Sequence, residues 1–392
     1  MAPQPGSLSV LADDLSGAVE SAALLGPGTP VHLDPPARAD HAPQQVLDTD
    51  TRRLDPSAAA DRLERAWASL GPGRVFVKID SLLRGPVPAL VSVAARHGTV
   101  LLCPALPTEG RAVVDGVLLC SGRPLAATTA WQLEPTPPPA TVAELFPDHP
   151  VQHVPTAALR DGGLAETVRS TRDRVLVCDA STPADLAALG RVLDEHPHLV
   201  GVGSAQLLAG WRPPPRAAPA PDRPAGPTRP VLVLVGSASA EAREQTRQLL
   251  RRPDVAEVPA PLRGARLDAT RLAAELARAR GRAATTVLTL PALADPAPGT
   301  SLDPDRLAAD LGAVVAEAVR DRPDDLVLIG GTTARATLGA LGVDLLRVRG
   351  GIHPGAVATT DRSGRVVVTR PGSHGPPTSL LDILDWLEGH PR

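Results

Sequence analysis

The chain has 392 residues, a length that favours two domains over one. Its 40 basic and 43 acidic residues give a formal net charge of −3, and the basic residues are scattered singly or in pairs. Such a chain has no general attraction to nucleic acid or to an anionic membrane, so neither is expected as a partner. The N-terminal stretch MAPQPGSLSVLADDL lacks a basic segment followed by a long apolar one, which predicts a cytoplasmic protein.

Short apolar runs alternate with helical segments along the first half of the chain. The expected strands lie at 9–12, 75–79, 99–103, 174–178 and 199–203, and the expected helices at 17–25, 86–97, 182–193 and 204–211. The segment GVLLCSGRPL (116–125) has a glycine turn between two short runs, which predicts a hairpin. Strands that alternate with helices of this length are typical of a parallel sheet.

The proline-rich segment WRPPPRAAPAPDRPAGPTRP (211–230) interrupts this pattern and has no apolar periodicity. Such a segment is typical of a semi-rigid, exposed linker, so we predict one domain at 1–210 and another at 231–392. Beyond the linker, the expected strands lie at 231–235, 286–290, 326–330 and 365–369, and the expected helices at 239–250, 303–320, 332–341 and 378–388. The sequence thus predicts an α/β protein of two domains, each a mainly parallel sheet flanked by helices.

Polar residues directly after the apolar runs are the candidates for function, because parallel sheets bind ligands beyond the carboxyl ends of their strands. The first are Asp13 and Asp14, which follow a strand and precede the helix that Ser16 and Gly17 open. One acid would suffice to cap this helix, and an N-cap is the structural alternative. Two acids favour a functional role, in which one orients or deprotonates a hydroxyl and the other binds a sugar or a metal.

Two further strand ends carry charged residues. Arg52, in LDTDTRRL (47–54), could grip a substrate carboxylate with both arms of its guanidinium, or lie in solvent. Lys78, in VFVKIDSLLRG (75–85), is the only lysine of the chain, which indicates a need for a compact, rotatable ammonium. An ion pair between Lys78 and Asp80 is the structural alternative. The residues that would form a carboxylate or oxyanion cradle at this strand exit are Lys78, Asp80, Ser81, Arg84 and Gly85.

Small residues form three turns beyond the linker: VGSAS (235–239), GGTTA (330–334) and RPGSHG (370–375). In the first two a strand passes through small residues into a helix, so a phosphate could approach backbone N–H groups at the helix N-terminus. Neither turn matches GxxxxGK[ST] or GxGxxG, so the standard nucleotide loops are absent from the sequence. Close packing of helix on strand would require similar glycines and is the alternative.

In chain order these motifs resemble those of the four-carbon acid sugar kinase family, once called DUF1537, whose members phosphorylate threonate, erythronate or 3-oxotetronate with ATP. The segments that carry the resemblance are ADDLSGA (12–18), DTDTR (48–52), KIDSLLRG (78–85), PALPTEGR (104–111), GVLLCSGRPL (116–125), VGSAS (235–239) and GGTTA (330–334). Together they extend over nearly the whole chain, and the first and third are the most specific.

The resemblance implies an N-terminal domain for the sugar acid, a C-terminal domain for ATP with Mg²⁺, and a cleft between them. The catalytic residues that it implies are Asp14, Lys78 and Asp80, with Asp14 the first candidate to orient or deprotonate the attacking hydroxyl. The substrate-binding residues that it implies are Asp13, Arg52, Ser81, Arg84 and Gly85. The nucleotide-binding residues that it implies are Ser237, Gly330, Gly331, Thr332, Thr333 and Gly372. It identifies no protein ligand of the metal, and it allows a homo-oligomer.

Two departures from the family pattern lie in the nucleotide half. Thr332 stands where the family has an acidic residue, and Arg370 stands where it usually has a lysine. These departures leave room for three alternatives to an ordinary member: altered nucleotide use, a different acyl or sugar substrate, or a protein that binds a sugar acid or related metabolite without kinase activity. An unrelated α/β oxidoreductase is a further hypothesis, which the absence of GxGxxG disfavours.

Overall fold

The computed structural model describes residues 7–35, 42–131, 134, 136–171, 174–212, 229–264, 266–290, 303–372 and 374–389. The chain divides into two compact units, one of Met1–Leu25 with Thr29–Ala217 and one of Gly26–Gly28 with Ala218–Arg392. Most of the predicted linker, residues 213–228, lies outside the described residues. Among the described residues, no helix combines the length and the apolar character that crossing a membrane requires.

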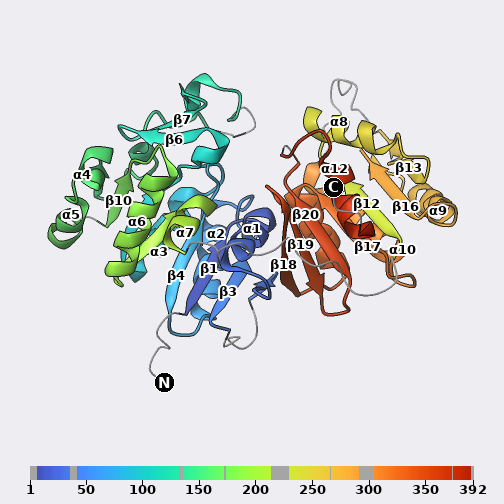
Figure 1. Cartoon of the computed structure of the whole chain (residues 1–392), viewed down its shortest axis with the longest axis horizontal. Coiled ribbons are helices and arrows are strands. Elements are labelled where there is room, and N and C mark those ends of the chain that lie inside the picture. The colour runs from blue at the N-terminus through green and yellow to red at the C-terminus, as the bar shows by residue number, and fades with distance from the viewer. Residues whose placement is uncertain are drawn as a thin grey trace. The chain divides into compact units, whose positions relative to one another are not determined.

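The first unit is built on a parallel sheet with helices along it (Figure 1). Its strands, in spatial order, are β2 (Pro30–His32), β3 (Gln44–Asp48), β1 (Leu8–Ala12), β4 (Arg74–Lys78), β11 (Leu199–Gly203), β5 (Thr99–Cys103), β10 (Val175–Cys178) and β9 (Val151–Val154). All of these strand pairs are parallel. The helices are α1 (Leu15–Leu25), α2 (Pro56–Ala68), α3 (Val87–His97), α4 (Thr156–Arg160), α5 (Leu164–Ser170), α6 (Pro183–Glu195) and α7 (Ala205–Trp211).

A small antiparallel sheet is inserted in this unit after β5. Its strands are β6 (Arg111–Val114), β7 (Val117–Cys120) and β8 (Arg123–Pro124), and short 3₁₀ helices at Pro107–Glu109, Leu125–Ala127 and Val142–Leu145 flank it. Ser121 and Gly122 make the turn between β7 and β8 with φ of 49° and 77°, the geometry of a tight hairpin turn. The predicted hairpin is therefore confirmed.

The second unit also has a mainly parallel sheet. Its strands, in spatial order, are β13 (Val255–Pro259), β16 (Thr285–Thr289), β12 (Val231–Val235), β17 (Asp325–Ile329), β20 (Val366–Arg370), β19 (Ala356–Asp361) and β18 (Leu345–His353). The pairs from β13 to β20 are parallel, and β19 runs antiparallel to both of its neighbours, β20 and β18. The helices are α8 (Ala240–Leu249), α9 (Ala269–Arg280), α10 (Pro304–Ala318), α11 (Gly331–Ala340) and α12 (Ser379–Glu388), and β14 (Leu262–Arg263) pairs with β15 (Arg266–Leu267).

The central strands are buried along their whole length, which explains their uninterrupted apolar sequences. Every residue of β12 (VLVLV) and β17 (DLVLI) is buried, as expected for parallel strands that are covered on both faces. The apolar face of α12 packs into the same core through Leu380, Ile383 and Leu384. The prediction of an α/β protein with mainly parallel sheets flanked by helices is confirmed.

The strands that sequence analysis missed lack such apolar runs. β9 (VQHV) and β13 (VAEVP) lie at the ends of their sheets and are partly exposed, so polar residues interrupt them. β18 contains two glycines and is exposed or half-exposed at each residue from Arg349 to His353, and β19 ends in TTD. These strands are held by pairing with a neighbour, which no local pattern encodes.

Candidate functional site

Three strand ends of the first unit meet at one edge of its sheet. Ala12, the last residue of β1, is in register with Asp48 at the end of β3 and with Lys78 at the end of β4. The segments that follow these strands carry the residues predicted to act on the sugar acid. The structure therefore brings those residues together at the edge where parallel sheets bind ligands.

Asp13, which is buried, and Arg52, which is partly buried, form an ion pair that joins these segments. Arg52 Nε donates to Asp13 Oδ2 at 2.7 Å and Nη2 donates to Oδ1 at 2.8 Å, while the Asp80 backbone N–H donates to Oδ2 at 3.1 Å. Burial raises the pKa of Asp13, against the opposing charge of Arg52. Burial alone would lower the pKa of Arg52, but the charges of Asp13, Asp14 and Asp80 raise it well above its usual value. Both groups are engaged by the protein itself.

Replacing Arg52 by methionine is expected to lower the free energy of unfolding by about 3–5 kcal/mol, because Asp13 would keep a buried charge without its cation. Urea denaturation checks this. The exposed neighbour provides the control: Arg53→Met should change the free energy of unfolding by no more than about 0.5 kcal/mol. Equal stability of the two variants would show that the Asp13–Arg52 pair does not hold the site together.

Asp14 caps α1 and remains accessible. Its Oδ1 accepts a hydrogen bond from the Gly17 backbone N–H at 2.9 Å and lies 3.2 Å from Arg52 Nη2. Its side chain is 24% exposed, against 1% for Asp13. The N-cap alternative is thus correct for Asp14, but the cap engages only Oδ1, and the carboxylate is still partly exposed. Of the two acids, only Asp14 can present an oxygen to a ligand.

Lys78 ends β4 and is 6% exposed. Its Nζ donates to the Ile79 carbonyl at 3.1 Å, and among the described residues no carboxylate forms an ion pair with it. A Cβ atom on Gly17 would lie 2.8 Å from Lys78 Nζ and 2.8 Å from Asp14 Oδ1, so only glycine lets the ammonium and the carboxylate approach the start of α1 so closely. The structure therefore leaves a buried cation beside Asp14.

The predicted alternative of a Lys78–Asp80 ion pair is wrong, because Asp80 forms ion pairs with Arg84 and Arg52 instead. Arg84 Nε donates to Asp80 Oδ2 at 2.6 Å and Nη2 donates to Oδ1 at 3.1 Å, while Arg52 Nη1 lies 3.7 Å from Oδ1. Burial alone would raise the pKa of Asp80, but the charges of Arg52, Arg84 and Lys78 and the hydrogen bond from Arg84 hold it below its usual range. Asp80 is therefore ionised at neutral pH.

Gly85 follows with φ of 78°, and a Cβ atom there would lie 2.5 Å from the Arg52 carbonyl oxygen. A side chain at this position would therefore clash with the Arg52 backbone, and its positive φ would be strained. The Gly85 N–H donates to Glu134 Oε2 at 3.3 Å. Glycine is thus required for the turn that brings the segment after β4 against the segment after β3.

Two residues at this edge were not among the predicted site residues. Arg111, at the start of β6, donates through Nη1 to the Ser81 hydroxyl, and among the described residues no carboxylate forms an ion pair with it. Glu20, on α1, lies within electrostatic reach of Lys78, and burial raises its pKa. The only sequence signal for Arg111 was its loop, TEGR, and Glu20 lies one turn after the ADDLSGA motif on the same helix.

In the second unit, all six residues predicted to bind a nucleotide line one cavity of about 200 Å³. These residues are Ser237, Gly330, Gly331, Thr332, Thr333 and Gly372, and Gly236 joins them. They follow β12, β17 and β20, and the cavity lies at the N-terminus of α11. Pockets for whole ligands usually hold about 300–1,000 Å³, so this one suits a phosphate group better than a complete nucleotide.

Close packing explains two of these glycines. A Cβ atom on Gly236 would lie 2.2 Å from Thr333 Oγ1, and one on Gly372 would lie 2.3 Å from Ser237 Oγ. Gly330 has φ of 102°, which lets the chain turn from β17 into α11. The packing alternative is therefore correct for Gly236, and Gly372 packs as closely on Ser237; both glycines also line the cavity at the α11 N-terminus.

No group of three or more His, Cys, Asp or Glu side chains among the described residues could hold a metal ion. No acid lines the nucleotide cavity, and Thr332 is exposed at its rim. Mg²⁺ usually keeps several waters and binds through substrate phosphates with one or two carboxylates. The residues present thus fit a metal that arrives with phosphate oxygens and water, and they do not form a cage of their own.

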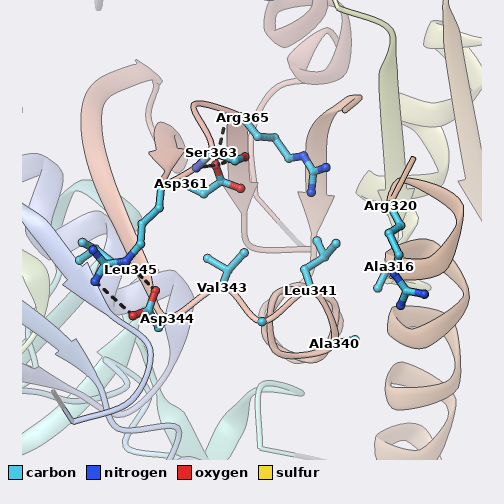
Figure 2. Close-up of a pocket in the computed structure, with 12 residues that line it drawn as sticks. Ala316, Arg320, Ala340, Leu341, Val343, Asp344, Leu345, Asp361, Ser363 and Arg365 are labelled. Atoms are coloured by element: carbon cyan, nitrogen blue, oxygen red, sulfur yellow. Dashed lines mark hydrogen bonds and ion pairs between the residues drawn. The ribbon is translucent and has the colours of Figure 1, made fainter. Parts of the chain in front are cut away.

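A larger cavity of about 350 Å³ lies elsewhere in the second unit, where α10 and α11 end and β20 begins (Figure 2). Leu341 and Val343 point into it, and Arg365 and Arg320 lie at its wall (Figure 2). Helix C-termini carry partial negative charge, which disfavours phosphate. Within the second unit this cavity has the greater volume of the two, but the smaller one lies at a helix N-terminus and at the carboxyl ends of the strands.

In comparisons with known proteins, the two halves of the chain match two different family models. A family model described as a sugar-binding N-terminal domain matches residues 8–211, and one described as a nucleotide-binding C-terminal domain matches residues 232–380. A D-threonate kinase of Cupriavidus necator is 32% identical over 95% of this chain and 95% of its own. A 3-oxo-tetronate kinase of the same organism is 27% identical over 80% of this chain and 78% of its own.

Among solved structures, a Salmonella typhimurium LT2 protein described as a tRNA synthase matches with a TM-score of 0.78 at 20% identity. The match covers 96% of this chain and 98% of that one. At this identity the likeness establishes the fold alone.

Proposed function

This chain belongs to the four-carbon acid sugar kinase family, and we propose that it transfers the γ-phosphoryl group of ATP to a hydroxyl of a four-carbon sugar acid such as threonate. The observation that carries the proposal is the buried Lys78 ammonium, which has no carboxylate partner among the described residues and lies beside Asp14. The carboxylates of Asp80 and Glu20 act on Lys78 electrostatically, but no described carboxylate lies within ion-pair distance of its Nζ. A sugar acid or a phosphoryl group in transfer would supply that direct partner, which a buried charge favours.

Arg111 is our candidate for binding the carboxylate of the sugar acid. Its guanidinium is positioned by the Ser81 hydroxyl, and its charge is not paired with any described carboxylate. Arg84 commits Nε and Nη2 to Asp80 but stays 37% exposed, so it can add a contact at the rim. Asp13 and Arg52 act as positioning residues in this proposal, since their polar atoms bind each other.

Asp14 accepts the proton of the attacking hydroxyl in the proposed reaction. The substrate oxygen forms a bond to the γ-phosphorus, the bond from that phosphorus to the bridging oxygen breaks, and ADP leaves with the electron pair. Lys78 offsets negative charge on the group in transfer, a contribution that matters because phosphoryl transfer depends mainly on positioning and charge neutralisation. Asp80 is the second candidate for the base, but Arg84 and Arg52 hold it as an ion pair.

For the nucleotide, we propose that phosphate oxygens accept hydrogen bonds from the N–H groups at the start of α11, with Ser237 and Gly372 at the opposite wall. Mg²⁺ bound with the nucleotide would neutralise phosphate charge, and the exposed Thr332 hydroxyl is one polar group of the cavity lining that could bind its water shell. A cavity of about 200 Å³ leaves the adenosine outside it.

Measurement of ADP release with a panel of D-threonate, L-threonate, D-erythronate and 3-oxo-tetronate tests the proposal. We expect turnover with at least one of these acids that depends on both ATP and Mg²⁺. Absence of turnover together with absence of nucleotide binding by calorimetry would overturn the kinase proposal. Stabilisation of the fold by an acid without any ADP release would instead favour the sugar-acid-binding protein, for which Thr332 in place of an acid is the motivating observation.

Gly372→Ala is expected to raise the KM for ATP about tenfold or more, without changing the KM for the sugar acid. The added Cβ would lie 2.4 Å from Ser237 Cβ, so the turn must move away from Ser237, at a cost of about 1–3 kcal/mol. Steady-state kinetics check this. Gly339→Ala is the matched control: it lies on α11 with only Arg335 Nη1 nearby, at 3.7 Å, and should leave both KM values unchanged.

A further inference from the structure

Arg370 is a buried cation at the end of β20, beside the proposed nucleotide cavity. It is 1% exposed, and among the described residues no carboxylate forms an ion pair with it. Its Nε has no hydrogen-bond partner, while Nη1 donates to the His374 carbonyl and Nη2 donates to Gln245 Oε1. Burial lowers the pKa of Arg370 to about 10, so the side chain is still charged at neutral pH.

Gln245, on α8, completes this arrangement and is 0% exposed. Its Nε2 lies 3.0, 3.1 and 3.0 Å from the carbonyl oxygens of His374, Gly375 and Pro376, so its two N–H donors are shared among three acceptors. Arg370 and Gln245 therefore direct their N–H groups at three successive carbonyls, and a further hydrogen bond joins the two side chains. An unsatisfied buried carbonyl is costly, so this pair fixes the path of the chain after β20.

The path of this segment decides one wall of the nucleotide cavity. Gly372 packs so tightly on Ser237 that a Cβ atom would lie 2.3 Å from Ser237 Oγ, and Ser239 Oγ donates to the Gly372 carbonyl at 3.0 Å. On the other side, the Arg370 carbonyl accepts the Gly330 N–H at 2.9 Å, directly before α11. Arg370 is thus bonded through its main chain to Gly330 at one wall, and through its side chain to the segment that follows Gly372 of the other wall.

We propose that Arg370 and Gln245 are positioning residues for the nucleotide: they hold residues 374–376 so that Gly372 stays against Ser237 at the cavity wall. The inference deepens the proposed nucleotide site and rests on it. The buried guanidinium also carries a positive charge that no carboxylate among the described residues pairs, and its residue lies two positions before Gly372 of the cavity wall. A bound phosphate chain supplies the missing negative charge, so nucleotide binding and the Arg370 charge should stabilise each other.

Calorimetric titration with MgATP of the wild type, Arg370→Met, Arg370→Lys and Gln245→Met tests the proposal. We expect MgATP affinity to fall at least tenfold in Arg370→Met and by a smaller factor in Arg370→Lys, which keeps the charge but can reach only one of the two acceptors. Gln245→Met should weaken MgATP binding about as much as Arg370→Met. The affinity for the sugar acid should be unchanged in all three, which separates positioning of the nucleotide from general damage to the fold.

Hydrogen exchange gives a second readout that does not depend on activity. The amides of Gly372, His374 and Gly375 should exchange faster in Arg370→Met than in the wild type. Bound MgATP should slow their exchange by a smaller factor in Arg370→Met than in the wild type. Arg247→Met is the matched control, because Arg247 lies on α8 with Gln245 but pairs with Glu244 and is 58% exposed. It should leave MgATP affinity and exchange at all three amides unchanged.

The outcomes separate the inference from the proposed function. If the wild type does not bind MgATP, the proposed kinase activity fails. If the wild type binds MgATP and the Arg370 and Gln245 variants bind it equally well, the positioning role is overturned while the kinase activity stands. Should Arg370→Met fail to fold, Arg370→Lys carries the same comparison, and a folded Arg370→Lys with unchanged MgATP affinity and unchanged exchange overturns the inference.

Discussion

Replacement of Asp14 by asparagine is expected to lower kcat by a factor of about 10²–10⁴, the usual contribution of a positioned general base. Asparagine keeps an oxygen that can accept the Gly17 N–H, so the cap on α1 survives while the proton acceptor is lost. The KM values for ATP and the sugar acid should change little. Steady-state ADP release, with each substrate varied in turn, measures both effects.

Asp61→Asn is the control for this experiment, because it makes the same chemical change at an exposed position of α2 and should leave kcat unaltered. Asp80→Asn gives the competing assignment. If Asp80→Asn abolishes turnover while Asp14→Asn retains wild-type kcat, the base is Asp80 and Asp14 serves only as a cap.

Lys78 is the second position where a large effect is expected. Lys78→Met should lower kcat/KM by a factor of about 10²–10³, because it removes a preorganised charge from the reacting group. Lys78→Arg should be nearly as inactive. The side chain is 6% exposed and its Nζ already lies against Gly17, so a planar guanidinium has no room to take the place of the ammonium. The measurement is kcat/KM for the sugar acid at saturating ATP.

An exchange of the same two residue types on the surface provides the control. Arg96, which is 64% exposed and pairs with Glu64, should tolerate replacement by lysine without loss of kcat/KM. If Lys78→Arg has full activity in a preparation whose wild type is an active kinase, then the single lysine of the chain reflects composition and not function, and the proposed role of Lys78 is wrong.

The fold could be read from sequence wherever a strand is buried on both faces. β12 (VLVLV) is apolar and buried at every residue, and β1, β4 and β17 each have a buried apolar run of at least two residues at their centre. Strands such as β9 and β13, at the ends of their sheets, have no such signature. Their positions depend on partners far along the chain, and no local pattern of residues specifies those partners.

The neighbourhood of the site residues also followed from sequence. Residues directly after parallel strands must meet at one edge of the sheet, so Asp14 and Lys78 could be expected near each other, as could Ser237 and Gly330. The contacts made by the small antiparallel sheet and by the loop after it could not be predicted from the positions of the strand ends. Arg111 reaches Ser81 from the small antiparallel sheet, and Glu134 reaches Gly85 from the loop beyond it.

The sequence by itself therefore determined the α/β architecture, the two sets of polar residues at strand ends, and the likeness to a family of sugar acid kinases. Only the tertiary structure decided which charges are already paired. Arg52 binds Asp13 and Arg84 binds Asp80, whereas Lys78 and Arg370 have no described carboxylate partner. The physical reason is that apolar periodicity is a property of residues close together in the chain, so it can be recognised in the sequence. An ion pair depends on distances of a few ångströms between side chains from distant segments, which only the tertiary structure sets.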